Sequence, residues 1–378
     1  MGKFKIKYLV LIFTVFLMTG CWDYVGVDNI SIVTGMAIDK DDKTNNYKAA
    51  FEVVNIDVSN KIEVVKTEIV ETMGKTLFDT SRNAKKRLMN KLYFGDMEVV
   101  IIDKKIAEKD GINTILNWFL RDTEIRGTLN FVISEEKTAM EILNNNALNH
   151  PIVGLLIKEI LKNDNGVTSS TIYQPLYRAY NNLHDNGCSL AFPIFRIVEN
   201  DGKETLESNG IAVFKKDKMI GQFQSNESKY YLFISNNVNG GLLTFDSNKD
   251  NIDDITLEIS GNNTSKKYSY EDGKFKFLIT TNTVVHLSEA DEYHANISVK
   301  KIKELEKQAE QLIEKNIQKI IKKAKSEYKV DVFSLGSVVY KNNPKLWKKV
   351  KNDWEKKFLE TEIEVKSDVD IINTGFFK

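Results

Sequence analysis

The N-terminal third of the chain alternates between β-rich apolar runs and one amphipathic helical segment. Two β-rich runs, 27–39 and 47–57, flank the polar stretch 40–46, which predicts a β-hairpin with that stretch as its loop. A third strand is expected over 62–70. A helix is expected over 74–90, because its apolar positions share one face and its Arg and Lys residues lie largely opposite.

Shorter elements follow up to residue 195. Buried-type strands are predicted at 97–102 and 127–133, with a helix at 112–120 between them. Helical periodicity then dominates from residue 137 to 183. Together with the preceding elements, this pattern predicts an α+β N-terminal domain over 21–195.

The helical pattern stops near residue 195 and hairpins begin. The strands 210–214 and 219–223 flank the turn 215–218. Further strands are predicted at 255–259, 268–270 and 275–281. We therefore place a domain boundary near residue 195 and expect a β-rich region after it.

The last 80 residues carry the clearest periodicity. Apolar residues repeat at helical spacing from Ile302 to Ala324, which predicts a helix of about six turns. A helix stop at 331–336 precedes a second helix after Pro344. One face of that helix holds Trp347, Val350, Trp354 and Phe358. A final strand is indicated by the alternating Ile363, Val365, Val369 and Ile371. The fold class is thus α+β, with mixed or antiparallel sheets flanked by helices.

Composition narrows the function classes. The chain has 378 residues and equal numbers of basic and acidic residues, 53 each. This balance argues against a nucleic-acid-binding protein. A hydrophobic content of 42% excludes wholesale disorder, and two cysteines exclude a disulfide scaffold.

The first 20 residues have the pattern of a lipoprotein signal peptide. Three lysines precede an apolar run over 8–18, which at about 1.5 Å per residue is too short to span a bilayer. The run ends in 17–21, a lipobox in which Met18 holds the place that Leu usually occupies. We therefore predict that Cys21 carries an S-diacylglycerol and an N-acyl (palmitate) group. The alternatives are an ordinary secretory signal or an uncleaved anchor.

Catalytic and metal-binding motifs are not found in the sequence. The four histidines show no paired metal spacing, and no nucleophile or phosphate-binding motif occurs. The cluster from His184 to Cys188 is either a Cys/His pair or, as we favour, a turn before a small buried thiol. Asp39, Asp41 and Asp42 could bind calcium only loosely, because no Gly occupies the EF-hand turn position. We expect no enzyme activity and no cofactor.

Charge is unevenly distributed. Residues 300–357 hold 17 lysines and eight acidic residues. This segment either docks on anionic head groups or an acidic subunit, or consists of amphipathic helices with solvated outer faces. Trp347 and Trp354 are likewise either part of an interface or, at this spacing, part of the core, which we favour.

The order of several short motifs resembles one known family, the Ger(x)C proteins. These are the lipoprotein C subunits of nutrient germinant receptors in spore-forming bacteria. The similar segments are 20–24, 74–76, 92–95, 107–112, 121–126, 210–215 and 331–336, with Pro344, Trp347 and Trp354. They extend over the whole chain. One departure is Asp96, at a position where the family usually has His. Any role of that histidine in relatives therefore cannot be assigned to this chain.

The resemblance implies a non-enzymatic receptor subunit that is required for spore germination in response to nutrients. Its implied partners are the membrane, through the lipid anchor, and the A and B subunits of the receptor. Its implied location is the outer face of the spore inner membrane. Direct nutrient binding is left open by the resemblance. It also implies three domains, with the C-terminal half divided into 196–290 and 291–378.

A rival interpretation is a solute-binding lipoprotein of a transporter. That fold needs repeated βαβ units and a ligand cleft between two parallel-sheet lobes. The hairpins expected between residues 205 and 285 argue against it. A cell-envelope hydrolase is a third interpretation, which the missing catalytic motifs weaken.

Overall fold

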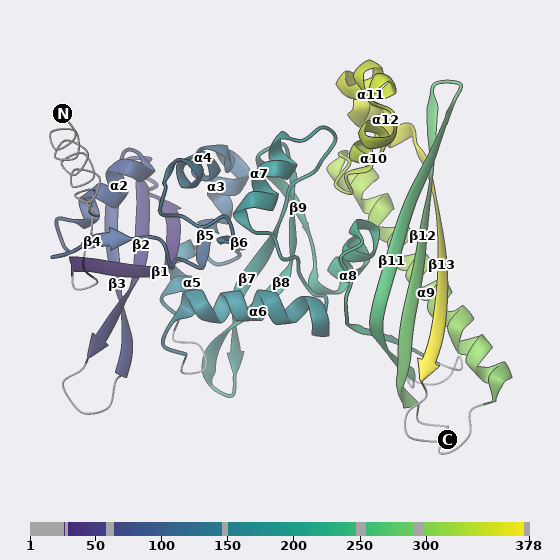
Figure 1. Cartoon of the computed structure of the whole chain (residues 1–378), viewed down its shortest axis with the longest axis horizontal. Helices are drawn as coiled ribbons and strands as arrows, with labels where there is room; N and C mark the ends of the chain where they lie inside the picture. Colours follow the sequence, from purple (N-terminus) through teal and green to yellow (C-terminus); the bar gives the residue numbers. More distant parts are fainter. Residues whose placement is uncertain are drawn as a thin grey trace, which may run out of the picture.

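Two β-sheets lie next to each other along an elongated molecule (Figure 1). The structure is a computed structural model of the chain. It describes residue 26 and the ranges 29–57, 64–145, 150–246, 255–290 and 298–373. The fold is α+β, as the sequence predicts, with helices packed on both sheets.

The first sheet begins with the predicted hairpin. β1 (Ile30–Lys40) and β2 (Tyr47–Asp57) are antiparallel, and β3 (Val64–Gly74) continues the meander. Within the described ranges the sheet has the order β3-β2-β1-β5-β6-β7-β8-β9, and β4 (Lys91–Tyr93) pairs with the start of β1. The hairpin predicted from the polar stretch 40–46 is confirmed.

The centre of this sheet is parallel. β1 pairs with β5 (Val99–Asp103), β5 with β6 (Asn130–Ser134), and β6 with β7 (Ala191–Asn200). Every residue of β5 and β6 is buried because helices cover both faces, which explains the apolar runs 99–102 and 131–133 in these strands.

Different helices cover the two faces of the first sheet. One face packs on α2 (Leu77–Ala84), α3 (Lys104–Lys109), α4 (Asn113–Arg121) and α7 (Leu176–His184). The other packs on α5 (Ala139–Leu143) and α6 (Val153–Val167). The sheet therefore has a core on each side.

Two antiparallel strands, β8 (Lys203–Lys215) and β9 (Lys218–Phe223), complete the first sheet. α8 (Ser225–Ser235) then leads to the second sheet, which has the order β10-β11-β12-β13 in the described ranges. Its strands are β10 (Leu242–Phe245), β11 (Ile255–Glu271), β12 (Lys274–Ala290) and β13 (Glu362–Asn373). β13 runs parallel to β12 and forms an edge of the sheet.

One long helix, α9 (Val299–Lys323), packs along the second sheet (Figure 1). Three shorter helices follow it: α10 (Leu335–Asn342), α11 (Pro344–Val350) and α12 (Trp354–Glu360). A single buried cluster joins α9 and the second sheet to Ile211, Val213 and Phe223 of the first sheet. The two sheets thus share a core.

The edge strand β13 is covered by acidic side chains of α9. Glutamates spaced four residues apart on the helix accept hydrogen bonds from backbone N–H groups spaced two residues apart on the strand. The pairs are Glu306 with Ile371 (3.1 Å), Glu310 with Val369 (3.3 Å) and Glu314 with Ser367 (2.9 Å). The match is geometric, because four helical residues rise about 6.0 Å and two strand residues about 6.7 Å.

Two helix predictions were wrong in their bounds. The helix expected over 74–90 is only α2, because the chain turns after Ala84 and the Arg87 guanidinium binds the carbonyl of Glu71 on β3. The helix stop expected at 331–336 is present up to Ser334, but a helix that was not predicted, α10, begins at Leu335, and its Gly336 N–H donates to the Asp331 carboxylate (2.8 Å). A capping group four residues before the helix is not a standard N-cap signal.

The domain boundaries near residues 195 and 290 stay predictions. Residue 195 lies within β7, in the continuous first sheet. Residue 290 is the last residue of β12, next to the segment that leads to α9.

Candidate functional site

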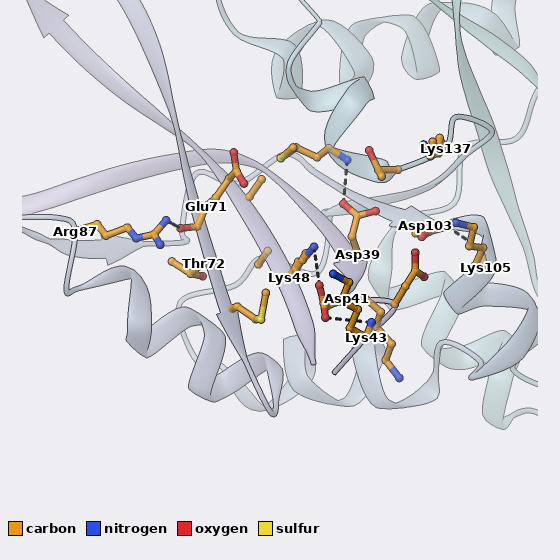
Figure 2. A pocket seen from close by; sticks show the side chains of 17 residues that line it. Asp39, Asp41, Lys43, Lys48, Glu71, Thr72, Arg87, Asp103, Lys105 and Lys137 are labelled. Atoms are coloured by element: carbon orange, nitrogen blue, oxygen red, sulfur yellow. Dashed lines mark hydrogen bonds and ion pairs between the residues drawn. The ribbon is translucent and has the colours of Figure 1, made fainter. Parts of the chain in front are cut away.

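A polar pocket of about 400 Å³ lies at the carboxyl ends of β1 and β5 (Figure 2). In sheets with parallel strands, this edge is where ligands usually bind. The β1–β2 loop, β3 and the first residues of α3 and α5 form its walls.

Asp39, near the end of β1, is one of two buried acids in this pocket. Its Oδ1 accepts a hydrogen bond from the backbone N–H of Ala139 (2.6 Å), and its Oδ2 accepts one from Met140 (3.1 Å). Its side chain therefore caps the N-terminus of α5. Burial raises the pKa of Asp39 to about 6, although the two backbone N–H groups act in the opposite direction.

Asp103, at the end of β5, caps a second helix. Its Oδ1 accepts from the backbone N–H of Lys105 in α3 (2.7 Å), and burial raises the pKa of its carboxyl group. Both inner carboxylates therefore hold helix N-termini in place. They are structural anchors of the pocket floor.

The rim of the pocket carries both signs of charge. Asp41 forms an ion pair with Lys48 (3.0 Å) and accepts a hydrogen bond from Thr44 N–H (2.8 Å), and these contacts lower the pKa of its carboxyl group. Lys43, Lys105 and Lys137 also line the pocket, and none of their ammonium groups is within 4.0 Å of a described carboxylate.

The hydroxyl groups of the pocket are also engaged. Thr72 donates to the carbonyl of Thr80 (2.9 Å), and Thr138 donates to Glu141 (3.1 Å). With its two buried acids capping helices, and with Lys43, Lys105 and Lys137 on the rim unpaired with any described carboxylate, the pocket suits a small polar or anionic molecule better than bond-breaking chemistry.

The cluster from His184 to Cys188 does not form a Cys/His pair. The His184 Nδ1 lies 2.9 Å from the carbonyl of Tyr180, and its ring packs on the Tyr180 ring. Cys188 is half-buried, and burial raises the pKa of its thiol, the opposite of an activated nucleophile. Gly187 provides a turn with φ of +70° between them. The interpretation as a turn is thus confirmed.

Metal binding by the acids at 39–42 has no support in the geometry. Asp39 caps α5 while Asp41 faces Lys48 (Figure 2). Across the parts of the chain that the structure describes, no group of three or more His, Cys, Asp or Glu side chains is arranged to hold a metal ion.

Cys21, the predicted lipid anchor, lies outside the described residues. Asp96 precedes β5 and forms an ion pair with Arg126 (2.8 Å), with both side chains largely exposed. Within the described ranges, no helix combines the length and the apolar composition needed to cross a bilayer.

The tryptophans of the C-terminal helices belong to the core, as predicted. Trp347 is 5% exposed and Trp354 is 7% exposed, and their rings meet edge-on at 5.4 Å. In the basic segment 300–357, Lys323 and Lys325 are partly buried and bind groups within the chain. Lys323 pairs with Glu227 (2.6 Å), and Lys325 donates to the carbonyl of Thr361.

The sequence did not reveal the pocket. It gave no reason to place Asp103, Lys137 and Thr138 next to Asp39, about 60 to 100 residues away. One available clue was an Asp at the end of a buried strand, just before a helix.

Two family models together match nearly the whole chain. Residues 23–197 match the model described as "Spore germination protein N-terminal domain". Residues 209–375 match the model described as "Spore germination B3/GerAC like, C-terminal".

Full-length relatives agree with this assignment. The chain is 28% identical to spore germination protein A3 of Bacillus subtilis and 25% identical to spore germination protein B3, covering 98% of both chains in each comparison. It is 23% identical to spore germination protein KC of the same organism, over 97% of this chain and 95% of the relative.

A solved structure has a similar fold. The crystal structure of the GerBC protein superposes with a TM-score of 0.55 and 21% identity, over 90% of this chain and 97% of that one. Sequence and fold thus agree over both halves, and the chain belongs to the GerAC-like (Ger(x)C) family of spore germination proteins.

Proposed function

We propose that this chain is a non-enzymatic, lipid-anchored C subunit of a nutrient germinant receptor, required for spore germination in response to nutrients. The observation that carries the proposal is the match to both family models in sequence order, over 23–197 and 209–375. Spore germination proteins of similar length support it, because the chain aligns with them nearly end to end.

The anchor is the second part of the proposal. A lipobox that ends in Cys21 would place two or three acyl chains on the mature N-terminus, which is sufficient for stable membrane attachment. The subunit would then lie on the outer face of the spore inner membrane, beside the A and B subunits. The absence of a catalytic motif in the sequence supports a role exerted through these partners.

A deletion strain tests the proposal. Removal of the gene should abolish germination triggered by the nutrients of this receptor, while growth, sporulation and receptor-independent germination stay normal. Loss of refractility and release of dipicolinic acid are the measurements. Normal nutrient germination in a strain without paralogous receptors would contradict the proposal.

Complementation separates the anchor from the receptor role. The wild-type gene should restore germination, whereas a Cys21→Ala gene should give a protein without lipid label and with reduced germination. A Cys188→Ala gene is the matched control, since it removes the other thiol and should restore germination fully. Lipid label that persists on the Cys21→Ala protein would contradict the anchor alone.

The rival solute-binding interpretation gains no support from the fold. It requires a cleft between two parallel-sheet lobes, whereas the second sheet here is largely antiparallel and the pocket lies at one edge of the first sheet. Calorimetric titration of the isolated protein with amino acids and sugars distinguishes the two, because tight binding would favour the solute-binding protein.

A further inference from the structure

Large apolar side chains are exposed on one face of the first sheet's helical layer. Phe78 on α2 is 56% exposed, Leu120 on α4 is 41% exposed, and Met89 after α2 is 93% exposed. α2 and α4 contact each other, and Phe78 and Arg121, the residue after Leu120, line one hollow between them. We call the surface formed by α2, residues 85–91 and the end of α4 the α2–α4 face.

Basic side chains surround these apolar groups. Arg82 lies one helical turn after Phe78, with its guanidinium 4.9 Å from the Phe78 ring centroid. The exposed cations of the face are Arg82, Lys85, Lys86, Arg87, Lys91 and Arg121. In the described structure, only Lys91 of these six pairs with a carboxylate, that of Glu124 (2.5 Å).

The acids near this face are already engaged in local structure. The Asp79 carboxylate accepts from Lys75 N–H (2.9 Å), and Asp122 accepts from Glu124 N–H (3.0 Å). Because these two carboxylates bind backbone N–H groups, the cations of the face are available to bind a separate molecule. A shallow hollow of about 320 Å³ between α2 and α4 is lined by Phe78, Arg82, Lys85 and Arg121, together with Asp122 and Glu124.

The face also adjoins the start of the described chain. Ile30, the first residue of β1, pairs with Lys91 in the short parallel ladder with β4. Cys21 is nine residues before Ile30, and nine residues span at most about 30 Å. A bilayer that holds an acylated Cys21 is therefore within reach of the α2–α4 face.

We infer that the α2–α4 face rests on an anionic lipid bilayer. Phe78, Met89 and Leu120 enter the headgroup boundary, and Arg82, Lys85 and Arg121 contact lipid phosphates. Apolar side chains ringed by Arg and Lys are the composition that binds such interfaces, and the attraction weakens as salt increases. The nearness of the bilayer rests on the proposed anchor at Cys21, but the affinity of the face for lipid does not.

The test uses the mature chain, 21–378, with Cys21→Ser so that no acyl group is attached. Sedimentation with vesicles of phosphatidylglycerol and phosphatidylcholine measures binding. We expect binding to mixed vesicles with phosphatidylglycerol, no binding to pure phosphatidylcholine, and a decrease with added NaCl. The variant R82E/K85E/R121E should bind the anionic vesicles at least tenfold more weakly.

A matched charge reversal provides the control. Lys345, Lys348 and Lys349 are exposed on α11, far from this face in the molecule (Figure 1), so K345E/K348E/K349E should bind as the parent does. Phe78→Ser should weaken binding without changing net charge. Circular dichroism and melting temperature show whether each variant is folded, and Arg82→Gln with Lys85→Gln replaces the reversal if it is not.

Three results would overturn the inference. They are no binding of the parent chain to anionic vesicles, equal binding of parent and R82E/K85E/R121E, and equal losses in the α11 control. If R82E/K85E/R121E loses binding to partner subunits but still binds vesicles as the parent does, the α2–α4 face is a protein interface instead. None of these results affects the lipid labelling of Cys21 or the deletion phenotype, so failure here is distinct from failure of the proposed function.

Discussion

Asp331 shows how one buried residue can organise a whole turn. Its carboxylate accepts hydrogen bonds from Phe333 N–H (3.1 Å), Gly336 N–H (2.8 Å) and the indole Nε1–H of Trp354 (3.0 Å). Burial raises its pKa, which these donors partly offset. A single acid thus fixes the start of α10 and positions the α12 tryptophan at once.

Trp354 should therefore contribute strongly to stability. Its ring also packs edge-on against Phe275 of β12, 5.3 Å between centroids. Trp354→Ala should lower the free energy of unfolding by about 3–5 kcal/mol in urea titrations. Trp354→Phe keeps most of the packing and loses only the hydrogen bond to Asp331, so it should cost about 1–3 kcal/mol. An alanine variant as stable as the wild type would show that the ring is not part of the core.

Asp39 should make stability depend on pH below neutrality. Its pKa rises from 3.8 to about 6 on folding, so the folded state binds its proton more tightly than the unfolded state. The contribution of Asp39 is therefore fully present below about pH 4 and is lost as pH rises through about 6. Relative to Asp39→Asn, the wild type should lose about 3 kcal/mol over this range.

Carboxyl NMR of Asp39 gives an independent reading of the same effect. A titration midpoint near 6 is expected, whereas exposed acids should titrate near 4. A constant difference in stability between the wild type and Asp39→Asn from pH 4 to 7 would contradict the assignment.

At the scale of elements, the glutamates of α9 protect the edge of the second sheet. An uncovered edge strand offers unpaired N–H groups to any other strand. Glu306, Glu310 and Glu314 occupy three such groups of β13, and Gln318 donates to the Ile363 carbonyl (3.0 Å). The helix therefore serves as packing partner and as cover for the edge.

Replacing the three glutamates by alanine should expose this edge. Each lost hydrogen bond costs about 0.5–1.5 kcal/mol, so the triple variant should be about 2–4 kcal/mol less stable. The amide protons of Ser367, Val369 and Ile371 should exchange faster with solvent. The triple glutamine variant is the control, because its side-chain oxygens can still accept, and it should keep most of the protection. Unchanged exchange in the alanine variant would show that these contacts do not protect the edge.

The elements with strong periodicity were those the sequence could predict. The apolar stripe of α9 and the alternation of Ile363, Val365 and Val369 in β13 depend only on local spacing, and both lie where expected. The role of Glu310 was invisible, because its partner Val369 is 59 residues away and an acidic residue on a helix usually faces water. The pocket was missed for the same reason, since Asp39 and Ala139 meet only in the fold.

At the scale of the whole molecule, the first sheet contains strands from the regions that both family models match, 23–197 and 209–375. The N-terminal model ends at residue 197, inside β7, whereas β8 and β9 lie beyond it. Ala212, Phe214 and Met219 of these strands belong to the core under α4 and α7. The two regions are therefore interdependent in folding.

Truncation should reveal this dependence. A chain of residues 21–197 exposes one edge of β7 and the apolar surface beneath β8, so it should aggregate on expression. A chain of residues 21–223 retains β8 and β9 and should remain more soluble. Light scattering and circular dichroism provide the comparison. A monomeric 21–197 fragment that unfolds cooperatively would contradict the prediction.

The shared core also has a mechanical consequence. Phe223 of β9 stacks on Phe333 with 6.2 Å between centroids and meets Tyr328 at 5.6 Å, so the first sheet is wedged against the segments that follow α9. The interior of a protein is too densely packed to deform continuously. We therefore expect the two sheets to move together as one body instead of bending at a hinge between them. A displacement of α10–α12 should then also displace the first sheet.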